Sequence, residues 1–222
     1  MHNTHKAIVS SARAVTLLGG GALGQNDLKI ALARAPVLVA ADSGAKNALA
    51  AGHIPVAVIG DLDSYHPHTN SIISPAHIHH IAEQDTTDFD KALRHIAAPL
   101  VLAIGVTGGR IDHQLAMYHT LVRHAERRCI AIGAEDIVFH APSQISLTLP
   151  KNTRVSLFPM QSVSGQSQGL RWPIDGIDFH PARKIGTSNE VVENVVKLSF
   201  NGPGMLIILP RVHLDFVIEA LL

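Results

Sequence analysis

The chain has 222 residues, of which 46% are hydrophobic, and it carries 18 basic (Lys and Arg) and 18 acidic (Asp and Glu) residues. This length suits one large domain or two modest ones with buried cores. The balanced charge argues against a nucleic acid or an anionic membrane as partner. Cys129 is the single cysteine, so no disulfide forms within the chain and a reducing compartment is expected. Without an apolar run of about 18 residues or a leader-like start, we expect neither a membrane span nor a signal peptide, and a cytoplasmic location.

The first 140 residues alternate short apolar runs with segments of helical spacing, which is typical of βαβ units and a parallel sheet. The expected strands are 14–18, 37–41, 56–59, 77–81, 100–104 and 129–132. Two crossover helices are expected from apolar residues at helical spacing, namely Phe89, Leu93 and Ile96, then Ile111, Leu115, Tyr118 and Val122. We therefore predict an α/β fold class, with a Rossmann-like domain of mainly parallel sheet over residues 1–140.

The apolar period changes to two after residue 140. Ile145, Leu147 and Leu149 alternate with polar neighbours, as expected of strands with one buried face. Turn-forming residues 201–204 (Asn-Gly-Pro-Gly) precede another apolar run. The pattern predicts a small antiparallel β-sandwich domain over residues 141–222.

The first expected strand ends in a glycine-rich turn at residues 19–24, and Asp42 ends the second. The spacing fits a dinucleotide-binding loop, so a nicotinamide-dependent oxidoreductase is one hypothesis. A purely steric need for glycine after a strand is another. Further acidic loops downstream disfavour the oxidoreductase, because hydride transfer does not require them.

Three acidic segments occur at regular intervals, at residues 60–64, 84–88 and 108–112, each after an expected strand. If the strands are parallel in one sheet, these loops meet at its carboxyl edge, where open α/β sheets bind ligands. Clustered carboxylates repel one another unless a cation lies among them, and oxygen ligands of this kind suit Mg²⁺ carrying substrate phosphates. The arrangement predicts phosphate chemistry.

Within these loops, Asp61 and Asp63 lie two apart, so on an extended segment both carboxylates face one metal. A polar turn is the alternative. In the second loop, Asp88 is interpreted as a further metal-facing acid, Thr87 as a phosphate contact and Asp85 as the helix cap. Simple helix capping by the whole segment is the competing interpretation.

Arg110 follows two glycines and precedes Asp112, so its guanidinium is placed to bind phosphoryl oxygens. A surface arginine paired with a neighbouring acid is the alternative. The chain contains 15 histidines, including a cluster at His77, His79 and His80 without further ligands at zinc spacing. We assign that cluster no function.

The segments 41–45, 60–64, 84–93, 108–116, 169–173 and 187–190 agree in order, spacing and residue type with one family, and the chain closely resembles the thiamine pyrophosphokinases. The resemblance implies an α/β catalytic domain with a β-sandwich domain. It also implies a homodimer whose active site lies at the subunit interface. The implied reaction is transfer of pyrophosphate from ATP to the hydroxyl of thiamine, with release of AMP.

By position, the resemblance makes three acids the Mg²⁺ ligands and catalytic cluster, Asp61, Asp63 and Asp88, with Arg110 and Asp112 also catalytic. It implies ATP contacts by Asp42, Thr87, Arg110 and Asp112, and thiamine contacts by Gln84, Trp172 and Ser188. The flat indole of Trp172 suits stacking against an aromatic cation, with ordinary core burial as the alternative. Ser43 and Lys46 depart from the family pattern beside Asp42. Besides the oxidoreductase, a non-enzymatic nucleotide or thiamine sensor is the remaining alternative.

Overall fold

The computed structural model describes residues 6–63 and 72–222, and the chain divides into two compact units, Met1–Thr120 and Leu121–Leu222. The strands of the first unit are β1 (Val9–Ser10), β2 (Val15–Leu18), β3 (Val37–Ala41), β4 (Ala57–Gly60), β5 (Ile78–His80), β6 (Ile96–Ala97) and β7 (Val101–Ile104). Its helices are α1 (Asp27–Arg34), α2 (Gly44–Ala50), the 3₁₀ helix η1 (Pro75–His77) and α3 (Asp88–Arg94), and α4 (Ile111–Arg123) begins in it.

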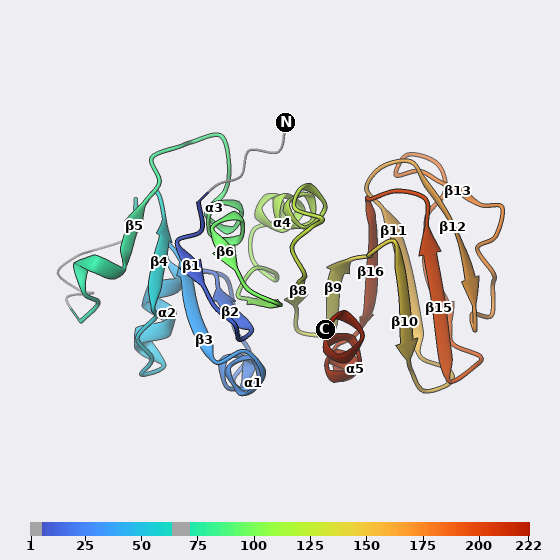
Figure 1. Ribbon diagram of the computed structural model, residues 1–222, viewed down its shortest axis with the longest axis horizontal. Coiled ribbons are helices and arrows are strands. Elements are labelled where there is room, and N and C mark those ends of the chain that lie inside the picture. The colour runs from blue at the N-terminus through green and yellow to red at the C-terminus, as the bar shows by residue number, and fades with distance from the viewer. Residues whose placement is uncertain (1–5, 64–71) are drawn as a thin grey trace. The chain divides into compact units, whose positions relative to one another are not determined.

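The first unit is built on a parallel sheet with the strand order β7-β2-β3-β4-β5 (Figure 1). All residues of β2, β4 and β7 are buried, as in strands covered on both faces. β1 and β6 form a separate parallel pair. The sheet is the frame that sets where the loops after each strand lie.

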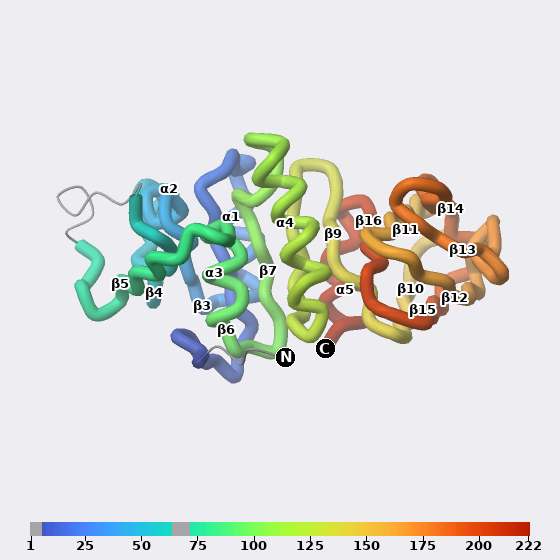
Figure 2. Tube along the Cα trace, turned by 90° about the horizontal axis from the view of Figure 1, so that it is seen from above, coloured from blue at the N-terminus to red at the C-terminus, as the bar shows by residue number. Residues whose placement is uncertain are grey.

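Helices cover both faces of this sheet. The crossovers through α1 and α2 step along the sheet in one direction, whereas α3 leads back from β5 to β7. Because such crossovers are right-handed, reversing direction moves the helix to the other face. The views agree, with α1 and α2 on one side of the strands and α3 on the other (Figure 2).

The second unit contains a run of antiparallel strands in the order β14-β11-β16-β9-β8 and a separate four-stranded antiparallel sheet in the order β10-β15-β12-β13. Its strands are β8 (Cys129–Ile132), β9 (Asp136–His140), β10 (Gln144–Thr148), β11 (Arg154–Pro159), β12 (Val163–Gln168), β13 (Asp178–Phe179), β14 (Gly186–Glu190), β15 (Val195–Phe200) and β16 (Met205–Pro210). Its last elements are η2 (Arg211–His213) and α5 (Leu214–Leu221). In β10, exposed and buried residues alternate, which confirms the predicted period of two.

Several expected elements differ from the structure. Ile96 does not continue α3 but lies in β6, because the helix ends at Arg94. Ile111 and Leu115 of α4 are 76% and 59% exposed, and the helix buries Met117 and Leu121 instead. The helical spacing was therefore correct, but the predicted apolar face was wrong.

The expected strand 129–132 has the predicted bounds, and it pairs antiparallel with the strand that follows it, β9. Within the described residues, no helix has the length and hydropathy needed to cross a membrane.

Candidate active site

A cavity of about 730 Å³ opens at the carboxyl edge of the parallel sheet. The chain order reverses between β2 and β7, and such switch points are where open α/β sheets bind ligands. The lining includes parts of all three acidic segments together with the glycine turn: Gly19, Gly20, Gly21, Asp42, Asp61, Asp63, Thr87, Asp88, Gly109 and Arg110. The tertiary structure thus brings the three predicted loops to one place.

Glycine is required where the loops after β2 and β7 cross. A Cβ on Gly19 would lie 2.5 Å from the Gly105 oxygen, and one on Gly21 would lie 2.6 Å from the same atom. Gly21 N also donates to Gly105 O at 2.8 Å. The steric interpretation of the glycine turn is therefore correct, and the close crossing leaves backbone at the cavity wall. α1 begins only at Asp27, so the turn does not lead directly into a helix.

The two acids of the first loop are brought together by a turn. Leu62 has φ of 61°, so the segment is not extended as predicted, and Asp63 N donates to Asp61 Oδ1 at 3.3 Å. The Leu62 side chain packs against the core beneath β3 and β4, which holds this left-handed turn in place. Ser64, at the end of this loop, lies outside the described residues.

The described acids offer a group for a divalent cation. One ligand atom each from Asp42, Asp61 and Asp63 lie within 4.8 Å of one another. Asp42 is buried, with a backbone φ of 38°, and its carboxylate was predicted to contact ATP rather than metal. Carboxylate oxygens in this arrangement fit a hard cation such as Mg²⁺. Asp88 is not part of this group, and its role as a metal ligand stays a prediction.

Asp88 is instead linked to Asp61 through Lys91. The Lys91 ammonium, on a side chain 1% exposed, lies 2.9 Å from Asp61 Oδ2 and 3.2 Å from Asp88 Oδ1. Asp61 N also donates to Asp88 Oδ1 at 3.1 Å. The hydrogen bond from Lys91 is the main reason that the pKa of Asp61 is lowered. Burial alone lowers the pKa of Lys91, but both carboxylates outweigh it and raise that pKa, so the lysine is charged.

The helix cap in the second loop is Thr87, not Asp85. Thr87 is the N-cap of α3, and its hydroxyl accepts a hydrogen bond from Asp90 N at 3.4 Å. Asp85 lies before this cap and is exposed. Thr87 also lines the cavity, so a phosphate contact by the same residue stays a prediction. Gln84 Nε2 donates to Asp61 Oδ2 at 3.5 Å and is exposed.

Arg110, which lines the cavity, forms an exposed ion pair with Asp112. The Arg110 Nη2 atom lies 2.6 Å from Asp112 Oδ2, and the side chains are 72% and 63% exposed. Through this hydrogen bond the pKa of Asp112 is lowered and that of Arg110 is raised. The alternative of a surface arginine paired with a neighbouring acid therefore describes this structure, although Arg110 also lines the cavity. Their catalytic roles stay predictions.

In the second unit, Trp172 is 56% exposed, so the interpretation as ordinary core burial is wrong. The guanidinium carbon of its neighbour Arg171 lies 5.9 Å from the ring centroid, and Arg171 Nε donates a hydrogen bond to Glu190 Oε1. The buried side chain of Asn189 hydrogen-bonds Trp172 N and O at 3.2 and 2.6 Å. The indole is thereby presented to solvent from a fixed backbone.

Ser188, predicted to contact thiamine, is exposed and has φ of 59°. Its N–H donates to the buried Ser156 Oγ at 3.0 Å, which supports the left-handed backbone. Its role toward thiamine stays a prediction.

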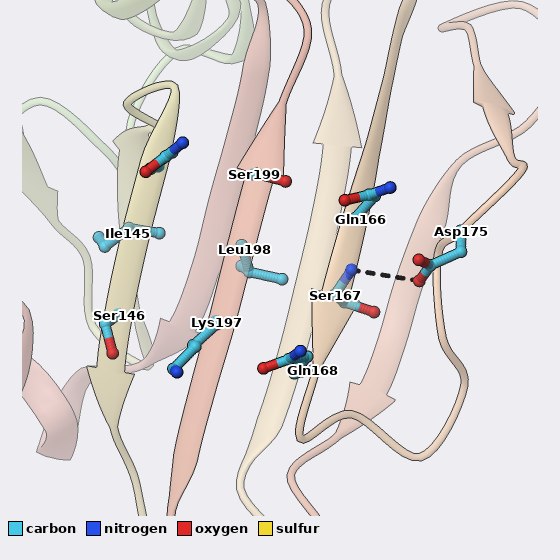
Figure 3. A pocket seen from close by; sticks show the side chains of 10 residues that line it. Ile145, Ser146, Gln166, Ser167, Gln168, Asp175, Lys197, Leu198 and Ser199 are labelled. Atoms are coloured by element: carbon cyan, nitrogen blue, oxygen red, sulfur yellow. Dashed lines mark hydrogen bonds between the residues drawn. The ribbon is translucent and has the colours of Figure 1, made fainter.

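The second unit also has a hollow of about 610 Å³ over β10, β15 and β12 (Figure 3). Polar side chains surround it, and Ser167 N donates to Asp175 Oδ2 at 3.2 Å. Its described lining contains none of the predicted site residues.

Two family models match the chain. The model for "Thiamin pyrophosphokinase, catalytic domain" matches residues 28–132, and that for "Thiamin pyrophosphokinase, vitamin B1 binding domain" matches residues 143–204. Both models describe domains of one family, the catalytic match precedes the vitamin B1 match along the chain, and together the matches cover most of it. The chain belongs to the thiamin pyrophosphokinase family. The acidic cavity lies within the catalytic match and the exposed tryptophan within the vitamin B1 match.

Curated relatives agree with this membership of the thiamin pyrophosphokinases. Thiamine pyrophosphokinase 1 of Oryza sativa subsp. japonica is 27% identical over 164 residues, covering 65% of this chain and 62% of the relative. Thiamine pyrophosphokinase of Bacillus subtilis (strain 168) is 28% identical over 185 residues, covering 77% and 85%. The chain thus spans about three fifths of the rice relative's length.

Solved structures share the fold. Thiamin pyrophosphokinase from Geobacillus thermodenitrificans has a TM-score of 0.71 at 21% identity and covers 89% of this chain and 96% of its own. The Candida albicans protein has a TM-score of 0.73 at 14% identity, covering 95% and 94%. At these identities the likeness establishes the fold: mixed α/β, with a mainly parallel sheet and a separate antiparallel sheet.

Sequence reasoning missed Lys91 and Asn189. Lys91 follows Asp88 by three residues, a spacing that places both side chains on one helix face, and this signal was available. Asn189 gave no comparable signal, because its partner Trp172 lies 17 residues away.

Proposed function

We propose that this protein transfers pyrophosphate from ATP to the hydroxyl of thiamine, giving thiamine diphosphate and AMP. The observation that carries the proposal is the cavity in which Asp42, Asp61 and Asp63 approach one another beside the glycine crossing. It lies in the part of the chain that matches the catalytic-domain model of the family.

The chemistry is in-line attack of the thiamine hydroxyl on the β-phosphorus of ATP, with AMP as the leaving group. Bound Mg²⁺, held by Asp61 and Asp63 with Asp42 or Asp88, would neutralise phosphate charge. The remaining contribution of the chain is positioning. The glycine crossing and Thr87 orient the phosphates of ATP. Arg110 breaks its ion pair with Asp112 and contacts phosphoryl oxygens. Asp88 orients the hydroxyl proton of thiamine.

In this proposal, Gln84, Trp172 and Ser188 contact thiamine. Trp172 offers an exposed aromatic surface in the vitamin B1 match, and Gln84 is bonded to Asp61 in the cavity unit. The proposal also includes a homodimer with an active site at the subunit interface, as the resemblance to the family implies. It also includes a Rossmann-like catalytic domain, 1–140, and a β-sandwich domain, 141–222. A cytoplasmic location stays a prediction from the single cysteine.

The deciding experiment mixes the protein with ATP, Mg²⁺ and thiamine and measures thiamine diphosphate and AMP by mass spectrometry. Both products should appear in equal amounts and only when all three reactants are present. Binding of ATP and thiamine without AMP would instead leave the sensor alternative. Stabilisation by NAD(P) without Mg²⁺ would favour the oxidoreductase, which no family match supports.

A further inference from the structure

Lys91 is a buried cation inside a cluster of acids. A lysine that is 1% exposed is rare unless it is paired, and its partners here come from two different segments of the chain. Asp61 belongs to the turn after β4, whereas Asp88 begins α3 with Lys91 on its next turn. The Lys91 ammonium and the Asp61 N–H therefore join the turn after β4 to the first residue of α3.

The ammonium competes with a metal ion for the same charge. It contacts Asp61 Oδ2 and Asp88 Oδ1, and Asp61 is also one of the acids that gather with Asp42 and Asp63. A divalent cation entering that group is attracted by the carboxylates but repelled by the nearby ammonium. A polyphosphate brought in with the cation supplies further negative charge and offsets this repulsion.

We propose that Lys91 is a positioning residue that holds Asp61 and Asp88 together before any ligand binds. It also keeps the affinity of the site for free divalent cations low, so that the metal ion enters together with the nucleoside triphosphate. The proposal rests on the proposed function, because it takes the cavity to be the site of a metal-bound triphosphate. Lys91 acts through the two carboxylates and transfers no group itself.

The first test uses the wild-type full chain and Mn²⁺, whose free concentration is measured by electron paramagnetic resonance. Mn²⁺ alone should bind weakly, and a non-hydrolysable ATP analogue should strengthen its binding by on the order of tenfold or more beyond the analogue's own affinity for Mn²⁺. Tight Mn²⁺ binding by the empty protein, unaffected by the analogue, would overturn the proposal.

The second test replaces Lys91→Met, which keeps an unbranched stem of similar size but removes the charge. K91M should bind Mn²⁺ alone on the order of tenfold more tightly than wild type. Its melting temperature should fall without metal and recover when Mn²⁺ is added, because the ion replaces the lost cation. Equal Mn²⁺ affinity in K91M and wild type would refute the idea.

Arg94→Met is the matched control. Arg94 lies on the same helix, is also buried and pairs with Glu83 and Asp90, neither of which belongs to the acidic group of the cavity. R94M should also lower the melting temperature, but Mn²⁺ should not restore it, and its Mn²⁺ affinity should match wild type. Equal recovery of both variants by Mn²⁺ would mean a general metal effect and would count against Lys91.

These measurements involve neither thiamine nor turnover, so they separate the two proposals. Weak Mn²⁺ binding that tightens in K91M, without thiamine diphosphate formation, would support the role of Lys91 and refute the proposed function. Formation of thiamine diphosphate, with the same Mn²⁺ affinity in K91M as in wild type, would support the proposed function and refute the role of Lys91. If K91M does not fold even with Mn²⁺, the wild-type comparison with the nucleotide analogue decides.

Discussion

The side-chain amide of Asn189 hydrogen-bonds both polar backbone atoms of Trp172. Asn189 Oδ1 accepts from Trp172 N at 3.2 Å, and Asn189 Nδ2 donates to Trp172 O at 2.6 Å. The same Oδ1 accepts from Glu190 N at 2.8 Å. A buried amide thus pairs with a peptide as another strand would, which fixes the backbone that carries the exposed indole.

Replacing Asn189→Ala should therefore act on thiamine through Trp172. Leaving the Trp172 backbone atoms without their partner should reduce the free energy of unfolding by about 1–3 kcal/mol. Thiamine affinity should fall while ATP affinity stays at the wild-type value, as measured by calorimetry. Unchanged thiamine affinity in a folded N189A protein would show that the indole does not depend on this pairing.

Trp172→Ala tests the indole itself. Because the side chain is 56% exposed, its loss should change the melting temperature little. Thiamine binding should weaken by on the order of 1 to 3 kcal/mol, the range of aromatic stacking and cation–π contacts, and ATP binding should not change. Equal losses for both ligands in calorimetry would contradict a specific role toward thiamine.

Asp63→Asn tests the acidic group without disturbing Lys91, whose ammonium contacts Asp61 and Asp88. Asp63 is exposed, so circular dichroism should be unchanged. AMP release should fall by on the order of a hundredfold or more, because the group loses one of its charged oxygen ligands. Wild-type turnover in D63N would remove Asp63 from the proposed metal group.

Gly60→Ala tests the close packing at the end of β4. A Cβ there would lie 2.9 Å from Asp42 Cβ and 2.9 Å from Asp88 Oδ1. Overpacking of this kind should lower the free energy of unfolding by about 1–3 kcal/mol and spread the acids apart. The control is Gly202→Ala, where the added atom meets nothing within 4 Å. Thermal melts should separate the two variants, and equal melting temperatures would contradict the crowding argument.

The Lys91–Asp61 pair should contribute to stability in a pH-dependent way. The pKa of Asp61 is lowered below 3.8 in the folded protein, so the pair stabilises the fold above that value and the contribution is lost as pH falls through the folded pKa. Melting temperatures measured below about pH 4 should therefore drop more steeply in wild type than in D61N. Parallel curves for the two proteins would exclude this contribution.

Local patterns determined much of the fold. Buried strands of four or five residues, such as β3 and β8, appear as uninterrupted apolar runs, and their predicted bounds match the structure. The period of two in β10 likewise follows from one buried face. The three acidic segments meet because parallel strands deliver the following loops to the same edge of a sheet.

Tertiary packing decided the rest. The apolar spacing of α4 could not tell which side is covered, so Ile111 was expected in the core and is exposed. The partner of β8 depended on a strand that follows it, β9, rather than on its own residues.

By itself, the sequence predicted that three acidic loops meet at one edge of the sheet and which family the chain resembles, because both depend on residue order and spacing. Only the tertiary structure decided that Leu62 makes a turn, that Lys91 lies between Asp61 and Asp88, and that Asn189 fixes Trp172. The physical reason is that a buried charge or amide is tolerated only where distant groups satisfy it, and a linear pattern does not name those groups.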